Sequence, residues 1–302
     1  MNYNFIRKEG FIVNKIILMT DSCCDLPYDF TKDNNLVVMS LRLTLGDRTI
    51  ADDLGKTLRY GDFYKAVRDG EMPKTAQANV YEFEQEFEKH IKNGDKVIYI
   101  GFSSALSGTY NSANIAMESL KEKYSDADIS VIDSKCASMG LGLLVYYANK
   151  MLKEGKDKDE IVKWVEENKL KVIHWFTVED LNHLYRGGRV SKATATVGTL
   201  LSIKPVMHVD NEGRLTPVEK ARGRKKSLSA LVNKLVEEIV NPEEQVIFIS
   251  HGDCIEDVEY VKEKILEKIN VKDIVVNHVG PVIGTHSGPG TVAIFYFAKG
   301  RE

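Results

Sequence analysis

A short apolar run that leads into a glycine- and serine-rich turn and then into a helix is the feature that most constrains this fold. Residues 97–100, VIYI, are typical of a buried strand, and the apolar residues within 113–120 recur at helical spacing. The turn between them carries the hydroxyl residues Ser103, Ser104, Ser107 and Thr109. Such a turn presents unpaired backbone N–H groups at the positive end of a helix, which suits an anion. The alternative is that Ser107 only caps the helix and the glycines only shape the turn.

Length and composition indicate a folded chain of two domains. Its 302 residues exceed one typical domain, and 43% hydrophobic with 28% charged residues support a sizeable core. The formal net charge of −3 gives no overall attraction to nucleic acid. Apolar runs near the N-terminus are too short for a signal-peptide core or a membrane span. Four cysteines without CxxC spacing fit a reduced, cytoplasmic setting.

The first half of the chain alternates strand and helix patterns. KIILMT, VIYI and ISVID are expected strands, and amphipathic or apolar helical stretches separate them. This alternation predicts an N-terminal α/β domain, residues 1–160, with a parallel sheet covered on both faces. Asp21 and Ser22 follow the first strand, where α/β sheets bind ligands. They are candidates either for the rim of a site or for capping the next helix.

The second half has a different order of elements. Residues 203–209 and 214–220 are expected strands, and the DNEG between them is a hairpin signal. Two strand–helix–strand units follow. We therefore expect a C-terminal α+β domain, residues 161–302, built on a mixed sheet.

His286 stands in an unusual segment, GTHSGPG. Four glycines and two prolines lie between Gly280 and Gly290, which predicts an irregular loop with exposed backbone N–H groups. A histidine in such a loop is poorly placed to fill a core, so a functional role is a candidate interpretation.

Arginines and lysines gather in the second half. Arg189 follows two glycines, and Arg222 and Arg224 belong to the run KARGRKK, at the expected start of a helix. Cations at a helix N-terminus oppose the helix dipole, which indicates a partner anion, either a phosphate or an acidic protein surface. The alternative is a solvated charged face. Nucleic acid is disfavoured because the run is short and no aromatic residues interleave it.

Other chemistries have weaker support in the sequence. The histidines lack ligand-like spacing with acidic residues or cysteines, so no metal site is expected. Ser107 and His286 could serve as nucleophile and base of an acyl-ester hydrolase or transferase, and this stays the alternative function. No GxSxG elbow surrounds the serine.

Six motifs, in order along the chain, resemble those of the DegV family. They are DSxxDLP after the first strand, TxQ at Thr75, SSxLSGTY at Ser103, LxxGGRV at Arg189, RxRKK at Arg222 and GTHxGPGT at Gly284. This family of bacterial fatty-acid-binding proteins includes the FakB subunits of fatty acid kinase. The resemblance runs from about Lys15 to the C-terminus, and it is the combination of motifs that makes it specific.

The resemblance implies two α/β domains with a long-chain fatty acid such as palmitate between them. It implies that Thr75 and Ser107 hold the carboxylate, with Ser103 and Ser104 as further candidates. It implies no catalysis by the chain alone and no other cofactor. The bound acid would be presented to a separate ATP-dependent kinase, which makes acyl-phosphate for phospholipid synthesis, and transient membrane contact is compatible with this role. His286, Arg189, Arg222 and Arg224 would serve phosphoryl transfer or kinase docking.

The sequence departs from the family pattern at three positions. Ala76 stands where the family commonly has serine, and Cys23 and Cys24 stand where it commonly has serine or threonine. The departures leave all the implied carboxylate ligands in place, and the two thiols are expected to reshape the rim of the pocket.

Overall fold

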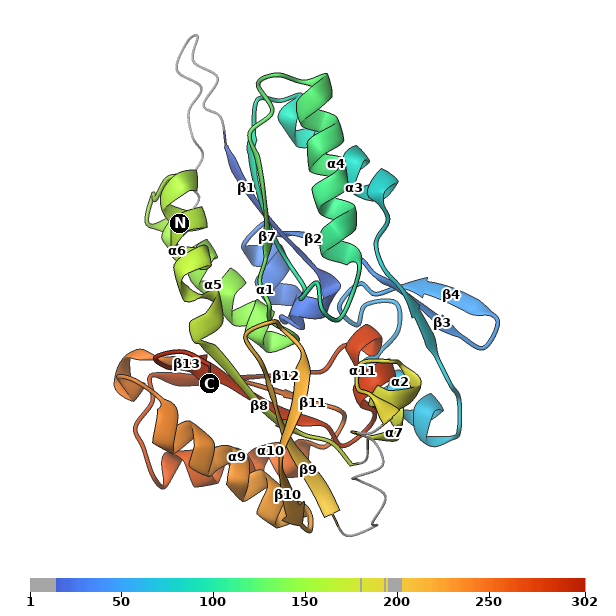
Figure 1. Ribbon diagram of the computed structural model, residues 1–302, viewed down its shortest axis with the longest axis vertical. Helices are drawn as coiled ribbons and strands as arrows, with labels where there is room; N and C mark the ends of the chain where they lie inside the picture. Colours follow the sequence, from blue (N-terminus) through green and yellow to red (C-terminus); the bar gives the residue numbers. More distant parts are fainter. Residues whose placement is uncertain (1–14, 180, 193, 195–202, 302) are drawn as a thin grey trace.

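Two sheet-based halves lie one above the other along the long axis of the molecule (Figure 1). The structure is a computed structural model that describes residues 15–179, 181–192, 194 and 203–301. The N-terminal apolar runs up to residue 14, and most of the small-residue segment after Arg189, lie outside the described residues. Within the described part of the chain, no helix is long and apolar enough to cross a bilayer.

The first half is built on a four-stranded parallel sheet in the order β2-β1-β6-β7. Its strands are β1 (Ile16–Asp21), β2 (Val37–Met39), β6 (Lys96–Gly101) and β7 (Ile129–Asp133). Helices α3 (Val80–Ile91) and α4 (Thr109–Lys123) pack on one face, and α5 (Met139–Lys153) and α6 (Lys158–Asn168) on the other. The predicted parallel α/β arrangement is therefore confirmed. The expected boundary after residue 160 falls within α6, which contacts β6 and β7.

A small antiparallel sheet belongs to this half and contacts residues 281–287 of the other one. It consists of β3 (Arg42–Leu45), β4 (Arg48–Ala51) and β5 (Lys74–Ala76), in the order β4-β3-β5. The short helices of this half are η1 (Ser22–Cys24), α1 (Tyr28–Asp33) and α2 (Tyr60–Arg68). Helix α2 packs against α11 (Pro281–Ser287) of the second half, so segments far apart in sequence meet here (Figure 1).

The second half has a six-stranded mixed sheet, as the sequence predicted, and its strand order is β10-β9-β8-β13-β11-β12. The strands are β8 (Val172–Thr177), β9 (Ile203–Val209), β10 (Leu215–Arg222), β11 (Val246–His251), β12 (Asp273–His278) and β13 (Val292–Phe297). The remaining helical segments are η2 (Lys169–Lys171), α7 (Asn182–Arg186), α9 (Arg224–Glu238), η3 (Pro242–Glu244) and α10 (Ile255–Leu266). Only β11 and β12 pair in parallel among the described strands of this sheet.

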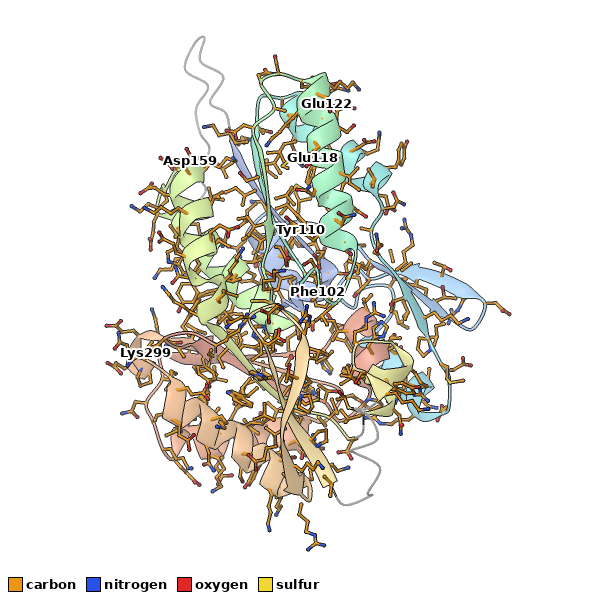
Figure 2. The ribbon with its side chains drawn as sticks, viewed as in Figure 1. Phe102, Tyr110, Glu118, Glu122, Asp159 and Lys299 are labelled. Atoms are coloured by element: carbon orange, nitrogen blue, oxygen red, sulfur yellow. The ribbon has the colours of Figure 1, made fainter. Side chains whose placement is uncertain are left out.

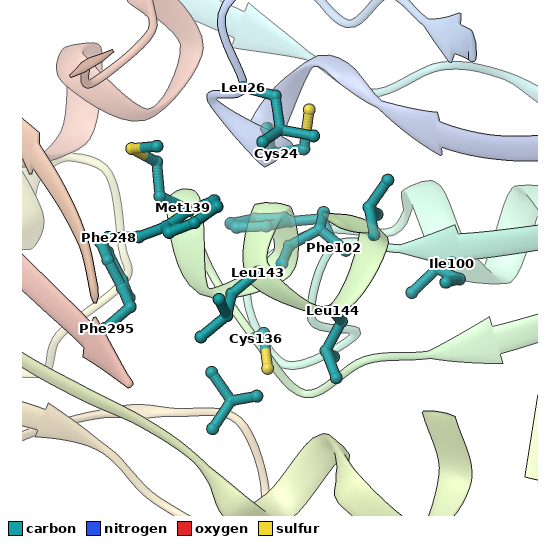
Figure 3. Packing of buried hydrophobic residues seen from close by; sticks show 14 of the residues in the cluster. Cys24, Leu26, Ile100, Phe102, Cys136, Met139, Leu143, Leu144, Phe248 and Phe295 are labelled. Carbon is teal, nitrogen blue, oxygen red and sulfur yellow. The ribbon is translucent and has the colours of Figure 1, made fainter. Parts of the chain in front are cut away.

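Helix α5 lies between the two large sheets and joins their cores. It contacts β1 and β6 on one side and β8, β11 and β13 on the other. Its buried side chains, among them Leu143 and Leu144, pack in one cluster with Ile100 of the first sheet and Phe248 and Phe295 of the second (Figure 3). A helix that is apolar around most of its circumference needs partners on every side, and the two sheets supply them.

The glycine-rich segment after β12 is the main departure from the expected fold. Instead of an irregular loop, residues 281–287 form helix α11. Pro281 occupies the first turn, where its missing N–H leaves no bond unmade, and Gly288 ends the helix at φ 79°. The Asp25 side chain accepts the Gly280 N–H at 2.9 Å just before the helix. Long-range contacts thus offset the low helix propensity of the glycines.

Candidate functional site

A cavity of about 390 Å³ lies between the two halves. Most of its wall is apolar. The large sheet of the second half contributes strand residues to it, whereas the first half contributes β5 of the small sheet and the segments that follow the strands of its large sheet. Among the lining side chains are Phe102, Leu106, Phe176, Leu215, Val282 and Phe295. Figure 2 shows Phe102, directly after β6, at the level where the two halves meet. The volume falls in the range of small-molecule sites, and the apolar wall suits a hydrocarbon.

Thr75 and His286 meet in this cavity across the domain interface. Thr75 lies in β5 of the small sheet, paired with Leu43 of β3. His286 lies in the last turn of α11. The Thr75 Oγ1 and His286 Nε2 atoms are 2.8 Å apart, and both residues line the cavity.

The imidazole of His286 is held neutral by its surroundings. Burial, together with the nearby charges of Arg189 and His183, lowers its pKa from 6.5 to about 4. Nδ1 is buried and has no hydrogen-bond partner among the residues that the structure describes. A neutral ring can donate from one nitrogen only, so the direction of the bond to Thr75 depends on the tautomer.

Ser107 and Gly108 line the same cavity at the N-terminus of α4. Gly108 is the N-cap residue and has no side chain to satisfy the first N–H groups of the helix. The Ser107 Oγ accepts from the Thr109 N–H at 3.3 Å and lies 2.9 Å from the Thr109 Oγ1. The Gln77 side chain lies against Gly108, which brings the strand of Thr75 next to this turn.

Arg189, from the second half, is the fourth polar side chain in the wall of the cavity. Its Nε donates to the Leu106 carbonyl at 3.1 Å, and its Nη1 donates to the Gly187 carbonyl. Burial lowers the pKa of its guanidinium. Thr75, Ser107, His286 and Arg189 all line the cavity. Together they offer hydroxyl donors, a neutral imidazole and one cation, a set that suits a carboxylate.

The other two serines of the turn point elsewhere. The Ser103 hydroxyl is fully buried and donates to the Gly213 carbonyl at 2.9 Å. Ser104 is exposed, and its Oγ accepts from the Lys135 Nζ at 3.0 Å. Neither side chain is among those that line the cavity. Ser103 therefore supports the contact of the turn with the second half, and Ser104 supports its contact with Lys135 of the first half.

The residues after the first strand are structural. Asp21 accepts from the N–H groups of Cys23 and Phe102 and from the Tyr99 hydroxyl, and burial raises its pKa to about 6. It caps η1 rather than the next α-helix and does not reach the cavity rim. Cys23 and Cys24 are fully buried, with thiol pKa values raised by burial. Neither cysteine lines the cavity, so the expectation that these thiols shape its rim is wrong.

The two arginines of the KARGRKK run differ in exposure and in their partners. Arg222 ends β10 and is exposed. Arg224 begins α9, and its partner anion is internal: Nε and Nη2 lie 2.9 and 2.7 Å from the Asp257 carboxylate of α10. Its Nη2 also donates to the Gly290 carbonyl. The unfavourable position of a cation at a helix N-terminus is thus offset within the chain itself.

Several wall residues carry no signal in the sequence. Phe176, Ala293 and Phe295 face the cavity because β8 and β13 are neighbours in the sheet, a pairing between distant segments. Ser138, which also lines the cavity, has a φ of 53° and donates to Asp25. Among the described residues, no group of His, Cys, Asp and Glu side chains could hold a metal ion.

Comparisons with known proteins agree with this architecture. The sequence model of the family described as "Uncharacterised protein, DegV family" matches residues 15–299. A DegV domain-containing protein of Clostridium perfringens is 48% identical over 96% of this chain and 100% of its own length.

Solved structures show the same fold. A DegV lipid-binding protein of Thermotoga maritima is 30% identical and superposes with a TM-score of 0.83, covering 95% of this chain and 100% of its own. DegV of Bacillus subtilis, described as a fatty acid binding protein, is also 30% identical, with a TM-score of 0.81 and the same coverage. The sequence match, the identity to curated relatives and the shared two-domain architecture show that this chain belongs to the DegV family.

Proposed function

We propose that this protein binds a long-chain fatty acid such as palmitate in the cavity between its two domains. The observation that carries the proposal is a mostly apolar cavity that also contains Thr75, Ser107, His286 and Arg189. The related proteins of Thermotoga maritima and Bacillus subtilis, described as lipid- and fatty-acid-binding, support the same ligand class.

The energetics favour a fatty acid over a short anion. Each methylene that leaves water contributes about 0.8 kcal/mol, so the acyl chain supplies most of the affinity. Hydrogen bonds from Thr75 and Ser107 to the carboxylate would be charge-assisted, at about 1.5–3 kcal/mol each. Arg189 adds a partly buried positive charge near the head group. The hydroxyls therefore orient the ligand, and the wall retains it.

We further propose that the bound acid is presented to a separate ATP-dependent kinase, which phosphorylates the carboxylate to acyl-phosphate. In this proposal residues 1–160 carry the carboxylate ligands, and residues 161–302 carry His286 and the arginines that face the kinase. Exposed Arg222 is the most direct candidate for a docking contact. Arg224, paired with Asp257, supports the position of α9 instead.

The alternative, an acyl-ester hydrolase or transferase, finds less support in the geometry. A serine nucleophile requires a base in hydrogen-bond contact. Here the His286 Nε2 faces Thr75, and the Ser107 hydroxyl faces Thr109. We therefore propose a binding role without catalysis by the chain alone.

Mass spectrometry of an organic extract of the purified protein tests the lipid part of the proposal. We expect one long-chain fatty acid per chain, and uptake of added palmitate after delipidation. An extract without any long-chain acid, together with no uptake of palmitate, would contradict the proposal. Ester turnover by the isolated chain, abolished by Ser107→Ala, would favour the hydrolase.

Charge reversal at Arg222 tests the kinase part separately. Because Arg222 is exposed and lies at the end of β10, we expect Arg222→Glu to keep palmitate binding and to lower the rate of kinase-dependent phosphorylation. Lys220→Glu, two residues earlier on the same exposed strand, is the matched control. An unchanged rate in Arg222→Glu would remove this residue from the docking surface.

A further inference from the structure

Gly187 lies directly against the ring of His286. A methyl group built on its Cα would overlap the imidazole, with Nδ1 as the nearest atom. The backbone of Gly187 is itself ordinary, at φ −72° and ψ −11°, and allows any residue. Glycine is therefore required at position 187 because a larger side chain would collide with His286, not because of the backbone conformation.

The contact with Gly187 decides where the proton of the neutral ring resides. Nδ1 faces the glycine, is buried, and has no hydrogen-bond partner among the described residues. An N–H group there would lose its water without gaining an acceptor, whereas a bare lone pair is the less costly group to leave unpaired. The ring therefore carries its proton on Nε2 and donates it to the Thr75 Oγ1, 2.8 Å away.

This direction of donation matters for the ligand. A threonine hydroxyl has one proton. If Nε2 were the acceptor, the Thr75 hydroxyl would donate its proton to the histidine, and only its oxygen lone pairs would face a carboxylate. With Nε2–H as the donor, the Thr75 proton remains available to an anion.

We propose that Gly187 is a positioning residue that fixes His286 in the Nε2–H tautomer, so that Thr75 donates its hydroxyl proton to the fatty-acid carboxylate. The inference deepens the proposed function and rests on it for the identity of the ligand. The tautomer itself follows from the geometry of the chain.

Hydrogen bonds through Arg189 connect Gly187 to the turn of Ser107, the other proposed carboxylate ligand. Its carbonyl accepts from the Arg189 Nη1, and the Arg189 Nε donates to the Leu106 carbonyl, one residue before Ser107. A continuous set of contacts thus runs from the turn of Ser107 through Arg189 and Gly187 to His286 and Thr75. Arg189 and His183 are the charged or titratable groups that act on the His286 ring, and both oppose a second proton on it.

Nitrogen NMR of the full chain, labelled at histidine, tests the tautomer directly. The His286 signal is assigned by its loss in His286→Ala. We expect a neutral Nε2–H ring in the wild-type protein down to about pH 5. In Gly187→Ala the displaced ring should gain water and titrate closer to the ordinary histidine pKa, about 6.5. A proton on Nδ1 in the wild type, or an unchanged titration in Gly187→Ala, would overturn the proposal.

Binding of palmitate in a double-mutant cycle tests the consequence. Loss of one charge-assisted hydrogen bond corresponds to a weakening of about ten- to hundredfold. We expect this loss in Gly187→Ala and in His286→Ala, because either change removes the Nε2–H donor that orients the Thr75 hydroxyl toward the carboxylate. The double variant should show no further loss, because the glycine acts through the histidine. Gly61→Ala, at a helical glycine with open space around it, is the control and should bind normally. Additive losses in the double variant would contradict the proposal.

The two readouts separate the inference from the proposed function. The NMR measurement needs neither fatty acid nor kinase. If the wild-type chain bound no palmitate, the proposed function would fail while the tautomer could still be observed. If palmitate bound tightly and the Nδ1–H form were found, the inference would fail and the proposed function would stand.

Discussion

Thr75 and Ser107 line the same cavity, yet their hydroxyls have different partners. Thr75 bonds to a histidine from the other half of the molecule, whereas Ser107 bonds to Thr109 within its own turn. The Thr109 N–H donates to the Ser107 Oγ, and either hydroxyl of the Ser107–Thr109 pair can donate to the other, so the serine proton can turn to a ligand when Thr109 is the donor. Two independent donors from two different elements can therefore converge on one carboxylate.

Removal of either hydroxyl should weaken binding of palmitate without unfolding the protein. We expect Thr75→Val and Ser107→Ala each to raise the Kd about ten- to hundredfold, because each loses one hydrogen bond to a charged group. Thr44→Val, on the neighbouring strand with an exposed hydroxyl, should leave the Kd unchanged. Isothermal titration of the delipidated proteins measures the effect. Wild-type affinity in the double variant Thr75→Val/Ser107→Ala would show that neither hydroxyl binds the carboxylate.

Asp52 carries a buried oxygen, Oδ2, without a hydrogen-bond partner in the described part of the chain. Burial raises its pKa from 3.8 to about 7. The folded state thus holds this proton more tightly than the unfolded chain, and the stability that the proton contributes is lost as the pH rises from about 4 to 7. At pH 8 the buried carboxylate is charged and unpaired on one side.

Asp52→Asn should therefore stabilise the protein at high pH. At about 1.4 kcal/mol for each unit of pKa shift, we expect a gain of about 2–4 kcal/mol in the free energy of unfolding at pH 8, and almost none at pH 4. Urea unfolding at the two pH values measures this difference. A gain of the same size at both pH values would show that ionisation of Asp52 is not its source. Asp47→Asn, at an exposed position in the turn between β3 and β4, is the control.

Helix α11 shows how one element positions the site. Its N-terminal end meets Asp25, its middle packs on α2, and its last turn carries His286. Gly284 in the middle permits a close approach, because a methyl group there would overlap Phe63 and Tyr64 of α2. The position of the histidine thus depends on a packing contact between the two halves.

Gly284→Ala should destabilise the protein although alanine favours helices. The gain in helix propensity is about 1 kcal/mol, whereas overpacking of a tight contact costs about 1–3 kcal/mol. We expect a net loss of about 1 kcal/mol in urea unfolding and a displaced His286. Gly61→Ala, in open space within α2, should be neutral or slightly stabilising. A stabilised Gly284→Ala variant would mean that α11 does not pack against α2 as described.

Local signals in the sequence predicted local structure well. The expected hairpin is present, with DNEG joining β9 to β10, and the expected strands over residues 97–100 and 203–209 lie within β6 and β9. The predictions that were wrong depend on contacts between residues far apart in the sequence. Helix α11 was expected to be a loop, because glycine content was visible in the sequence whereas contacts with Asp25 and α2 were not.

The candidate site was predictable to a similar extent. Hydroxyls at a strand-to-helix turn pointed to Ser107, but the same reasoning could not separate it from Ser103, whose hydroxyl bonds to Gly213, 110 positions away. The partner of Arg224, Asp257 of α10, depends on how two helices pack. The contact between Gly187 and His286 likewise requires the fold.

At the scale of the whole molecule, α5 joins the cores of the two halves. Its side chains belong to a single cluster that includes residues of both large sheets. A residue buried in this helix therefore stabilises both domains at once. The cavity lies beside this shared core, between the sheets, so the arrangement of the halves also sets the shape of the site.

Leu144→Ala should lower the stability of both halves together. Leucine-to-alanine changes in well-packed cores cost about 2–5 kcal/mol. We expect a loss of about 3 kcal/mol in a single unfolding transition, followed by circular dichroism and by the fluorescence of the two tryptophans, Trp164 on α6 and Trp175 on β8. Leu266→Ala, on an exposed position of α10, should change the midpoint little. Two separate transitions, with only one shifted, would contradict a shared core.

A crystal structure of the chain with palmitate tests the central claim most directly. We expect the carboxylate oxygens within about 2.5–3.2 Å of the Thr75 Oγ1 and the Ser107 Oγ. The acyl chain should run between the two sheets against Phe102, Phe176 and Phe295. Palmitate on the outer surface, or a cavity closed by the protein's own side chains, would contradict the claim.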